Sequence, residues 1–397
     1  MRLLRLIPAL DPKEGGPIEG ARRIDDELAR LGHQVEVACL DDPGQPWLSV
    51  YPATVHALGP ARMGYRYSPA LLPWLRANRQ RFDAVIVDGL WQYHGFAAWR
   101  ALAGTDTPYF VFTHGMLSPW FKQTYPLKHI KKWLYWPWAD YRLLRDARVA
   151  LFTCAEEQRL ARQSFWLYKA NEVVASLGTE QPPQDSNGHL ASAFRLHHSE
   201  LAGKRILLFL GRMHPVKGCD LLIHAFAQVA ACSPSLHLVM AGPDQTGLVA
   251  TLKKQAQSLG IADRITWPGM LQGDAKWGAF HAAEAFCLPS HQENFGIVVA
   301  EALGCGKPVL ISDKVNIWRE IEADGAGIVR PDTVEGTADA LRTWLALPPE
   351  AQERMREAGR QCFETRYRIE RVAVNLVNII SRHLGVEPSK TRTGSKP

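Results

Sequence analysis

The chain has 397 residues, of which 46% are hydrophobic, and a formal net charge of +6 at pH 7. This length exceeds what one compact core usually holds, so it predicts two domains. The charge is too small to indicate nucleic-acid binding, and no uninterrupted apolar stretch approaches the roughly 18 residues that a transmembrane helix needs. Any contact with a membrane is therefore expected to be peripheral.

The start of the chain and its cysteines bear on its location. In the opening segment "MRLLRLIPALDPKEGG", Arg5 interrupts the apolar run, so the segment fits a first strand better than a signal peptide. The seven cysteines show neither CxxC pairs nor Cys/His metal spacing. We interpret them as reduced core thiols of a cytoplasmic protein.

Strand and helix patterns alternate through the first half of the chain. Strands are expected at residues 3–7, 34–38, 84–88, 109–113 and 149–153. A helix is expected over "IEGARRIDDELARLG", where apolar residues recur at helical spacing and a glycine marks the end. Such alternation predicts a mostly parallel sheet with helices on both faces.

The same alternation restarts in the second half, after a stretch rich in Pro, Gln, Ser and Gly. Strands are expected at "KRILLFLGR", "LHLVMAGP", "ITWPG", "AFCLPS" and "PVLIS". We therefore predict an α/β fold of two doubly wound, Rossmann-like domains facing each other across a cleft. Their expected extents are an N-terminal domain over 1–180, a linker over 181–194, a C-terminal domain over 195–366, a helix over 367–385 that returns to the N-terminal domain, and a disordered tail over 386–397.

Two glutamates stand eight positions apart in "ENFGIVVAEALGCG". Glu293 is expected on the loop that leaves a buried strand, and Glu301 about two turns inside the following helix. The free N–H groups at the helix start attract phosphate oxygens, so a nucleoside diphosphate sugar fits, with sugar hydroxyls on Glu293 and ribose hydroxyls on Glu301. An ordinary helix-start acid and a solvent-facing helix residue explain the pair equally well.

A second loop carries two cations. In "FLGRMHPVKGCDLLIHAF" a strand ends at Gly211 and a helix begins near Cys219, which places Arg212 and Lys217 between them. A guanidinium and an ammonium on such a loop can hold a diphosphate. This loop and the loop of Glu293 leave the same edge of the predicted sheet, which favours a shared ligand over two solvated cations.

The Glu-x7-Glu spacing together with "GRMHPVKG" resembles the family 4 glycosyltransferases, retaining enzymes of the GT-B fold. The resemblance covers nearly the whole chain and is strongest from about 205 to 330. It implies that Arg212 and Lys217 bind the donor diphosphate, Glu301 the ribose and Glu293 the transferred sugar. It further implies donor contacts from Gly242 of "AGPD", from Gly269, Met270 and Leu271 of "WPGML", and from Asn294, Phe295, Gly296 and Ile297.

The first half adds a glycine pair and a histidine. Gly15 and Gly16 follow the first strand, where glycine lets the main chain approach a phosphate, and they resemble the family's N-terminal glycine loop. Their spacing, "GGPIEG", is not the GxGxxG of a dinucleotide site. In similar enzymes a histidine at the strand end occupied by His114 faces the donor sugar. The catalytic residues that the resemblance implies are His114, Arg212, Lys217 and Glu293.

The run over 119–145 places lysines beside tryptophans. This combination suits the headgroup region of an anionic membrane and would bring the enzyme to a lipid-linked acceptor. Alternatively, the tryptophans pack on the N-terminal sheet and the lysines form its solvated face. No nucleic-acid recognition motif accompanies the charges. The residues are Lys122, Lys128, Lys131 and Lys132 with Trp120, Trp133, Trp136 and Trp138.

Together these features predict a retaining glycosyltransferase, cytoplasmic and associated with the inner face of the membrane. It would move a hexose-type sugar from a nucleoside diphosphate sugar to a glycan or lipid-linked acceptor in cell-surface polysaccharide or glycoconjugate synthesis. No convincing DxD motif is present, so cations and helix N-termini, with neither metal nor cofactor, are expected to stabilise the leaving diphosphate. Two alternatives remain: another GT-B enzyme, such as a sugar-nucleotide epimerase or phosphorylase, and a non-catalytic protein that binds nucleotide sugars.

Overall fold

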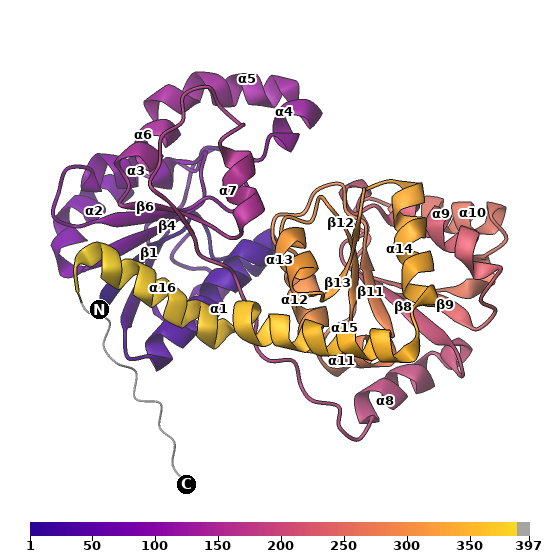
Figure 1. Cartoon of the computed structure of the whole chain (residues 1–397). Coiled ribbons are helices and arrows are strands. Elements are labelled where there is room, and N and C mark those ends of the chain that lie inside the picture. Colours follow the sequence, from indigo (N-terminus) through magenta and orange to yellow (C-terminus); the bar gives the residue numbers. More distant parts are fainter. Residues whose placement is uncertain (387–397) are drawn as a thin grey trace, which may run out of the picture. The chain divides into compact units, whose positions relative to one another are not determined.

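The structure, a computed structural model, describes residues 1–386, and its chain divides into two compact units (Figure 1). Unit 1 comprises Met1–Gly178 and the segment from Ile369 onward, and unit 2 comprises Thr179–Arg368. Each unit is a parallel sheet with helices, which confirms the predicted α/β class. The first and last residues of unit 2 lie side by side, because the Thr179 N–H donates to the Tyr367 carbonyl at 2.9 Å.

The described part of unit 1 contains a parallel sheet with the strand order β3-β2-β1-β4-β5-β6-β7. The winding direction reverses between β1 and β4. Because helices cover both faces, a central strand such as β4 is buried along its whole length and reads as a continuous apolar run. The strands are β1 (Arg2–Leu6), β2 (Gln34–Cys39), β3 (Thr54–Ala57), β4 (Ala84–Asp88), β5 (Tyr109–Phe112), β6 (Val149–Phe152) and β7 (Glu172–Val174).

Helix α16 (Ile369–Leu384) returns to unit 1 and lies along α1 (Gly16–Arg30), as Figure 1 shows. Its buried residues, among them Val372, Leu376 and Ile379, recur at helical spacing and join the core formed with the sheet. The other helices of the unit are α2 (Leu71–Asn78), α3 (Tyr93–Leu102), α4 (Trp120–Thr124), α5 (Pro126–Tyr135), α6 (Asp140–Asp146) and α7 (Ala155–Ala161).

Unit 2 repeats this plan with the strand order β10-β9-β8-β11-β12-β13, again all parallel. The winding reverses between β8 and β11. The strands are β8 (Arg205–Leu210), β9 (Leu236–Ala241), β10 (Ile265–Gly269), β11 (Ala285–Leu288), β12 (Val309–Ser312) and β13 (Gly327–Arg330). The helices are α8 (His189–His197), α9 (Cys219–Ala230), α10 (Leu248–Ser258), α11 (Gly273–Ala282), α12 (Ile297–Gly304), α13 (Trp318–Ala323), α14 (Val334–Ala346) and α15 (Pro349–Cys362).

The structure differs from the prediction in the linker. Helix α8 begins inside the stretch 181–194 and packs against α11. A Cβ at Gly278 would lie only 2.5 Å from the Leu190 carbonyl oxygen, so the absence of a side chain there permits the close packing of the two helices. The polar composition concealed the helix, because one short apolar side, with Phe194 buried, is enough to dock it.

Three edge strands and the exposure of one cysteine also differ from the expectations. Strands β3, β7 and β13 were not predicted, because they are edge strands of 4, 3 and 4 residues with little apolar pattern. All seven cysteines are free thiols, but Cys232 is exposed, so the core prediction is wrong for that residue. Beyond Val386, the predicted tail lies outside the described residues.

Candidate active site

The reversal of winding in unit 2 gathers the predicted donor residues. Strands β8 and β11 are hydrogen-bonded neighbours, and ligands of doubly wound sheets bind beyond the carboxyl ends of the strands at such a point. The loop after β8 carries Arg212 and Lys217, and the loop after β11 carries Glu293. The two loops that the sequence singled out are therefore adjacent.

Lys217 and Glu293 form an ion pair between these loops, with side chains 14% and 19% exposed. The main chain fixes Glu293, since its N–H donates to the Lys314 carbonyl and its carbonyl accepts from the Asn316 N–H, both at 3.0 Å. Lys217 ends a short 3-10 turn, Pro215–Lys217. One cation and one anion are thus held at adjacent positions, suited to a phosphate oxygen and a hydroxyl.

Two glycines allow the loops to approach this closely. A Cβ at Gly218 would lie 2.1 Å from the Pro289 carbonyl oxygen, and a Cβ at Gly242 would lie 1.7 Å from the Gly211 carbonyl oxygen. Only glycine fits at either position. Gly242 therefore has a packing reason of its own, because it sets the loop after β9 against the loop after β8.

Glu301 lies on α12, which begins at Ile297, so the residue is just over one turn inside the helix and the predicted two turns are wrong. The Lys276 ammonium lies 2.7 Å from Oε1 of Glu301, whose side chain is 3% exposed. The other carboxylate oxygen, Oε2, is buried without a hydrogen-bond partner. A buried polar atom left unpaired costs about 1–3 kcal/mol, so this oxygen is an open acceptor for a ligand hydroxyl.

The start of α12 offers hydrogen-bond donors. Within residues 1–386, the main-chain N–H groups of Gly296, Ile297 and Val298 donate no hydrogen bond. Gly296 has a φ of 73°, a left-handed conformation that glycine adopts without strain. Open N–H groups and the helix dipole together attract an anion at this end of the helix.

Four more predicted donor residues differ in accessibility. Arg212 is exposed and pairs with no described residue. At the end of β10, Gly269 is exposed, Met270 is 61% exposed and Leu271 is half-buried, so all three can contact a ligand.

The segment before α12 is less open. The side chain of Phe295 is buried and packs edge-to-face on Tyr367, with ring centroids 5.4 Å apart. Asn294 accepts a hydrogen bond from Asn316 at 3.3 Å. A contact between residue 295 and a donor would therefore come from the main chain.

Unit 1 has a pocket of about 430 Å³ where its own winding reverses. Its lining comes from the segments that follow β1, β4 and β5, and it includes Pro17 and Ile18 at the start of α1. Gly15 has a φ of 95°, and a Cβ at Gly15 or Gly16 would meet nothing within 4 Å. The glycine pair thus leaves open space beside the pocket.

His114 lines this pocket and is hydrogen-bonded to a buried network of charged side chains. Its Nε2 lies 2.8 Å from Asp88 Oδ1, and because a carboxylate only accepts, Nε2 carries the hydrogen. Asp88 Oδ2 accepts from Arg5 at 2.6 Å, and Arg5 also donates to Asp25 at 2.8 Å. Burial pushes the pKa of Asp88 up, but Arg5 and His114 outweigh it and hold the pKa below its ordinary value. The other ring nitrogen, Nδ1, is buried without a partner.

The turn that carries His114 is strained and anchored. His114 and Trp91, both in the pocket lining, have φ values of 47° and 71°, which side-chain-bearing residues rarely adopt. Glu157 of α7 accepts from the Gly115 N–H at 2.6 Å and from the Thr113 hydroxyl at 2.6 Å. Strain held in place in this way is common at ligand sites.

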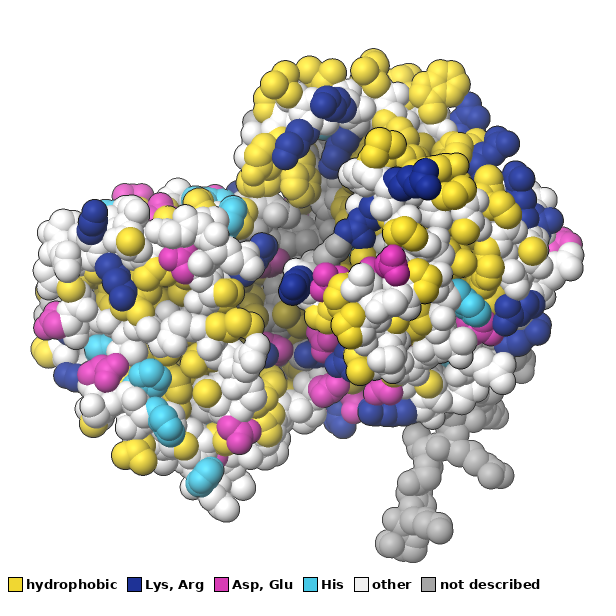
Figure 2. Space-filling model, turned by 180° about the vertical axis from the view of Figure 1, so that it is seen from behind, with side chains coloured by type: hydrophobic (Ala, Val, Ile, Leu, Met, Phe, Trp, Pro, Cys, Tyr) yellow, Lys and Arg dark blue, Asp and Glu magenta, His cyan; other side chains and the backbone are white. Residues whose placement is uncertain are grey.

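The lysines and tryptophans of the run over 119–145 are exposed at some positions and buried at others. Lys122, Lys128 and Lys131 are exposed on α4 and α5, with Trp133 45% and Trp138 68% exposed among them. Figure 2 shows apolar and basic side chains interspersed at the top of the molecule, where these helices lie. Trp136 is fully buried and stacks on Phe165, and Lys132 is partly buried at the pocket. The prediction of one shared surface is wrong for Lys132 and Trp136.

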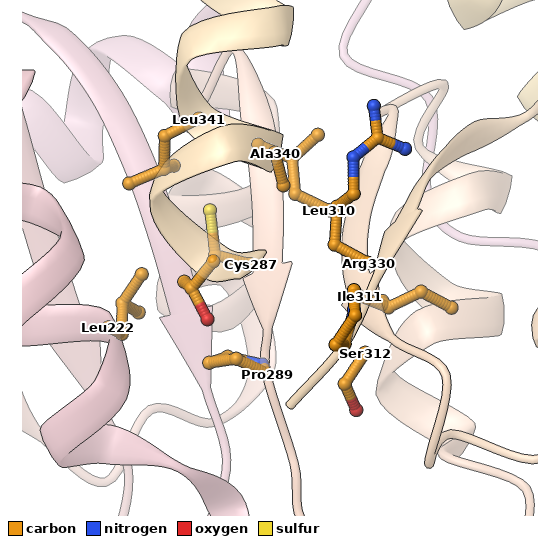
Figure 3. Close-up of a pocket in the computed structure, with 11 residues that line it drawn as sticks. Leu222, Cys287, Pro289, Leu310, Ile311, Ser312, Arg330, Ala340 and Leu341 are labelled. Atoms are coloured by element: carbon orange, nitrogen blue, oxygen red, sulfur yellow. The ribbon is translucent and has the colours of Figure 1, made fainter. Parts of the chain in front are cut away.

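A second cavity, inside unit 2, lies between α9, α14 and the sheet (Figure 3). It holds about 10 Å³, room for no more than a water molecule, and Leu222, Cys287 and Leu341 line it. Burial raises the pKa of the Cys287 thiol and keeps it unreactive. The cavity is a packing gap.

Several partners of the site were missed in the sequence. Asp88 at the carboxyl end of β4 was available as a signal, because an acid that ends an apolar strand of a parallel sheet lies at the binding edge. Lys276 and Arg5 carried no such signal, since one is an ordinary helix lysine and the other looked like an interruption of a strand.

No metal cluster or membrane span is found in the described chain. Over residues 1–386, no group of three or more His, Cys, Asp or Glu side chains is arranged to hold a metal ion. None of the helices in that range combines the length and apolarity that crossing a bilayer requires.

Solved structures of the same fold cover almost the whole chain. HepE of Anabaena in complex with UDP and glucose aligns with a TM-score of 0.75 and 18% identity, over 96% of this chain and 100% of that one. Sucrose-phosphate synthase of Thermosynechococcus elongatus aligns with a TM-score of 0.72 and 18% identity, over 97% of this chain and 99% of that one. The class of protein is thus the two-domain GT-B fold.

Family models match both units. The model described as glycosyl transferases group 1 matches residues 194–362, and the glycosyl transferase 4-like domain matches residues 15–178. The chain belongs to the family 4 glycosyltransferases, which confirms the resemblance seen in the sequence.

Curated relatives match a shorter region. The D-inositol 3-phosphate glycosyltransferase of Rhodococcus erythropolis is 32% identical over 164 residues, 40% of this chain and 37% of the relative. The corresponding enzyme of Segniliparus rotundus is 34% identical over 167 residues, 40% of this chain and 35% of the relative. The match therefore spans little more than a third of the length of these relatives.

Proposed function

We propose that the protein is a retaining, metal-independent glycosyltransferase that transfers a hexose-type sugar from a nucleoside diphosphate sugar to a glycan or lipid-linked acceptor. The observation that carries this proposal is the Lys217–Glu293 ion pair at the winding reversal of unit 2, with Arg212 on the same loop as Lys217. Nearby, the unpaired oxygen of Glu301 offers an acceptor for ribose hydroxyls.

The proposed roles follow from the charges. As the bond between the sugar and the diphosphate breaks, positive charge develops on the sugar ring and negative charge on the departing diphosphate. Lys217, Arg212 and the open N–H groups of α12 stabilise the diphosphate. Glu293 holds the hydroxyls of the transferred sugar, and in unit 1 His114 offers its open ring nitrogen to a sugar in the pocket that it lines. The cations serve the leaving group in place of a divalent metal.

The acceptor is assigned to unit 1, whose pocket of about 430 Å³ can hold a sugar. Three exposed lysines and the exposed Trp133 and Trp138 support a peripheral contact with the inner face of an anionic membrane. Such a contact would bring the protein to a lipid-linked acceptor in cell-surface polysaccharide or glycoconjugate synthesis.

A donor screen tests the proposal. The protein is incubated with UDP-, GDP- and ADP-linked sugars, and thermal stabilisation and release of the nucleoside diphosphate are measured, with and without added EDTA. We expect one class of donor to stabilise the protein and to be turned over regardless of EDTA. Stabilisation without any turnover would favour a non-catalytic binding protein, and interconversion of free sugar nucleotides would favour an epimerase.

A further inference from the structure

Lys132 lies in an unusual setting for a lysine. It projects from α5 into the lining of the unit 1 pocket, and its ammonium sits over the Trp91 ring at 4.5 Å and the Phe121 ring at 5.1 Å from the centroids. The neighbouring Lys131 is instead exposed on the same helix. Two aromatic rings thus fix the position of one cation at the wall of the pocket.

The ammonium of Lys132 lacks an acceptor. In the part of the chain that the structure describes, it makes no hydrogen bond or ion pair. Burial lowers its pKa. A partly buried ammonium with no acceptor is costly, because neither water nor protein replaces its full hydration. The Asp140 carboxyl interacts electrostatically with Lys132 but forms no ion pair with it. Burial raises the pKa of Asp140 to about 7, one of its oxygens accepts from the main-chain N–H of Trp91 at 3.1 Å, and the other has no partner.

The remaining polar groups of the pocket are of two kinds. The Asp88 carboxylate is already bound by Arg5 and His114, so the negative charge in the pocket wall is neutralised. The side-chain amide of Gln92 and Nδ1 of His114 have no partner among the described residues. The open groups are therefore the Lys132 ammonium, the Gln92 amide and the Nδ1 nitrogen of His114.

From this arrangement we propose that the acceptor carries an acidic group, a carboxylate or a phosphate, that pairs with the Lys132 ammonium in the unit 1 pocket. Gln92 and His114 Nδ1 bind the hydroxyls of the sugar beside that group. The inference rests on the proposed transferase function, since it assigns the unit 1 pocket to the acceptor. A sugar acid and a phosphate that links a sugar to its carrier share this chemistry.

Calorimetric titration of the full chain with simple sugars tests the proposal. The probes are methyl glucuronide for a sugar carboxylate, glucose 1-phosphate for a linking phosphate, and methyl glucoside as the neutral counterpart. We expect one acidic probe to bind about tenfold or more tightly than the neutral one, the usual strength of a charge-assisted hydrogen bond. The acidic probe that binds identifies the source of the charge.

Substitutions on α5 test whether Lys132 causes the preference for the acidic probe. Lys132→Gln should abolish the preference for the acidic probe, Lys132→Arg should keep most of it, and Lys131→Gln should leave it unchanged. Melting temperatures of the three variants report whether each is folded, and the arginine variant keeps the test valid if the glutamine variant unfolds. Equal binding of acidic and neutral probes, absence of binding by either acidic probe, or a preference that survives in Lys132→Gln would overturn the proposal.

Donor turnover on the same samples separates this inference from the function on which it rests. A wild-type protein that releases nucleoside diphosphate from a sugar donor but shows no acidic preference refutes only the inference. A protein that binds the acidic probe through Lys132 but turns over no donor refutes the transferase function and leaves an anion-binding pocket.

Discussion

The sheets of the two units have the same winding, but the side chains at the point where the winding reverses differ. In unit 2 the loops there carry the partly exposed pair Lys217–Glu293, and helices α11 and α12 add the pair Lys276–Glu301, whose carboxylate is buried. In unit 1 the charges of Arg5 and Asp88 are buried beneath the pocket behind His114, and the pocket wall is largely apolar. The loop charges of unit 2 suit a diphosphate, whereas in unit 1 the buried Arg5 and Asp88 orient His114 and leave Lys132 as the cation in the pocket wall.

This difference shows how two units with the same fold can bind different ligands. The backbone supplies the same edge in both units, and the side chains that end the strands decide what can bind there. A glycosyltransferase needs one edge for a diphosphate and one for an acceptor, so the asymmetry is what the proposed function requires. Substitutions that act on one edge alone test it.

The largest effect is expected from the cations of unit 2. Replacing Lys217 or Arg212 with Ala should reduce transferase turnover by about 100-fold or more, because each contact strengthens as charge develops on the diphosphate. Lys254→Ala, an exposed lysine on α10, serves as the control and should behave like the wild type. Steady-state kinetics with the donor found in the screen measures this. Unchanged turnover in both variants would remove the donor assignment of this edge.

The two glutamates should divide their effects between nucleotide and sugar. Glu301→Gln removes an anionic acceptor, so the affinity for free nucleoside diphosphate should fall by roughly 1.5–3 kcal/mol. Glu293→Gln should weaken the sugar-bearing donor more than the free nucleotide. Titration of each variant with both ligands compares them, and equal losses throughout would contradict separate roles.

In unit 1 the expected effect is on stability and depends on pH. Burial raises the pKa of Asp140 from 3.8 to about 7, so the folded state keeps a proton that the unfolded state loses. The stability that this proton provides is present at low pH and is lost as the pH rises from about 4 to about 7. Asp140→Asn should therefore be more stable than the wild type at pH 8, by on the order of 2 kcal/mol, and no more stable near pH 4.

Melting temperatures of both proteins across this pH range check the sign. Asp146→Asn is the matched control, because a hydrogen bond from Arg145 lowers the pKa of Asp146 and its loss should destabilise the protein at pH 8. If the stability difference between Asp140→Asn and the wild type were the same at every pH, folding would not raise the pKa of Asp140.

The smallest effect per residue is expected on the outer surface of unit 1. Each of Lys122, Lys128 and Lys131 should add about 1 kcal/mol of attraction to an anionic membrane. Changing all three to Gln should release the protein from anionic vesicles, and salt should weaken wild-type binding because screening shortens to about 8 Å at physiological ionic strength. Co-sedimentation at low and high salt measures this, with Lys253 and Lys254 of unit 2 changed to Gln as the control. Wild-type protein that ignores such vesicles at low salt would rule out the surface as an anchor.

How well each strand and helix could be predicted depended on how strong its local pattern of apolar residues was. The central strands and α1 were predictable because buried parallel strands are continuous apolar runs and α1 keeps a helical spacing. The Lys217–Glu293 proximity was predictable because both residues follow strands of one sheet. The edge strand β13 was missed because only Ile328 and Val329, between a glycine and an arginine, carry its apolar pattern. Lys276 and Arg5 could not be foreseen, since their roles depend on partners 25 and 83 positions away, which only the folded chain brings near.

The hydrogen bond between Thr179 and Tyr367 has a practical consequence for dissecting the protein. Because the two ends of unit 2 meet, residues 179–368 form one uninterrupted polypeptide that can be expressed alone or joined end to end and reopened elsewhere as a circular permutant. Unit 1 does not allow this, since its core needs α16 from beyond the insertion. A truncation after residue 178 would expose the apolar surface that α16 covers, so an isolated unit 1 has to be built with 369–386 joined back through a short connector.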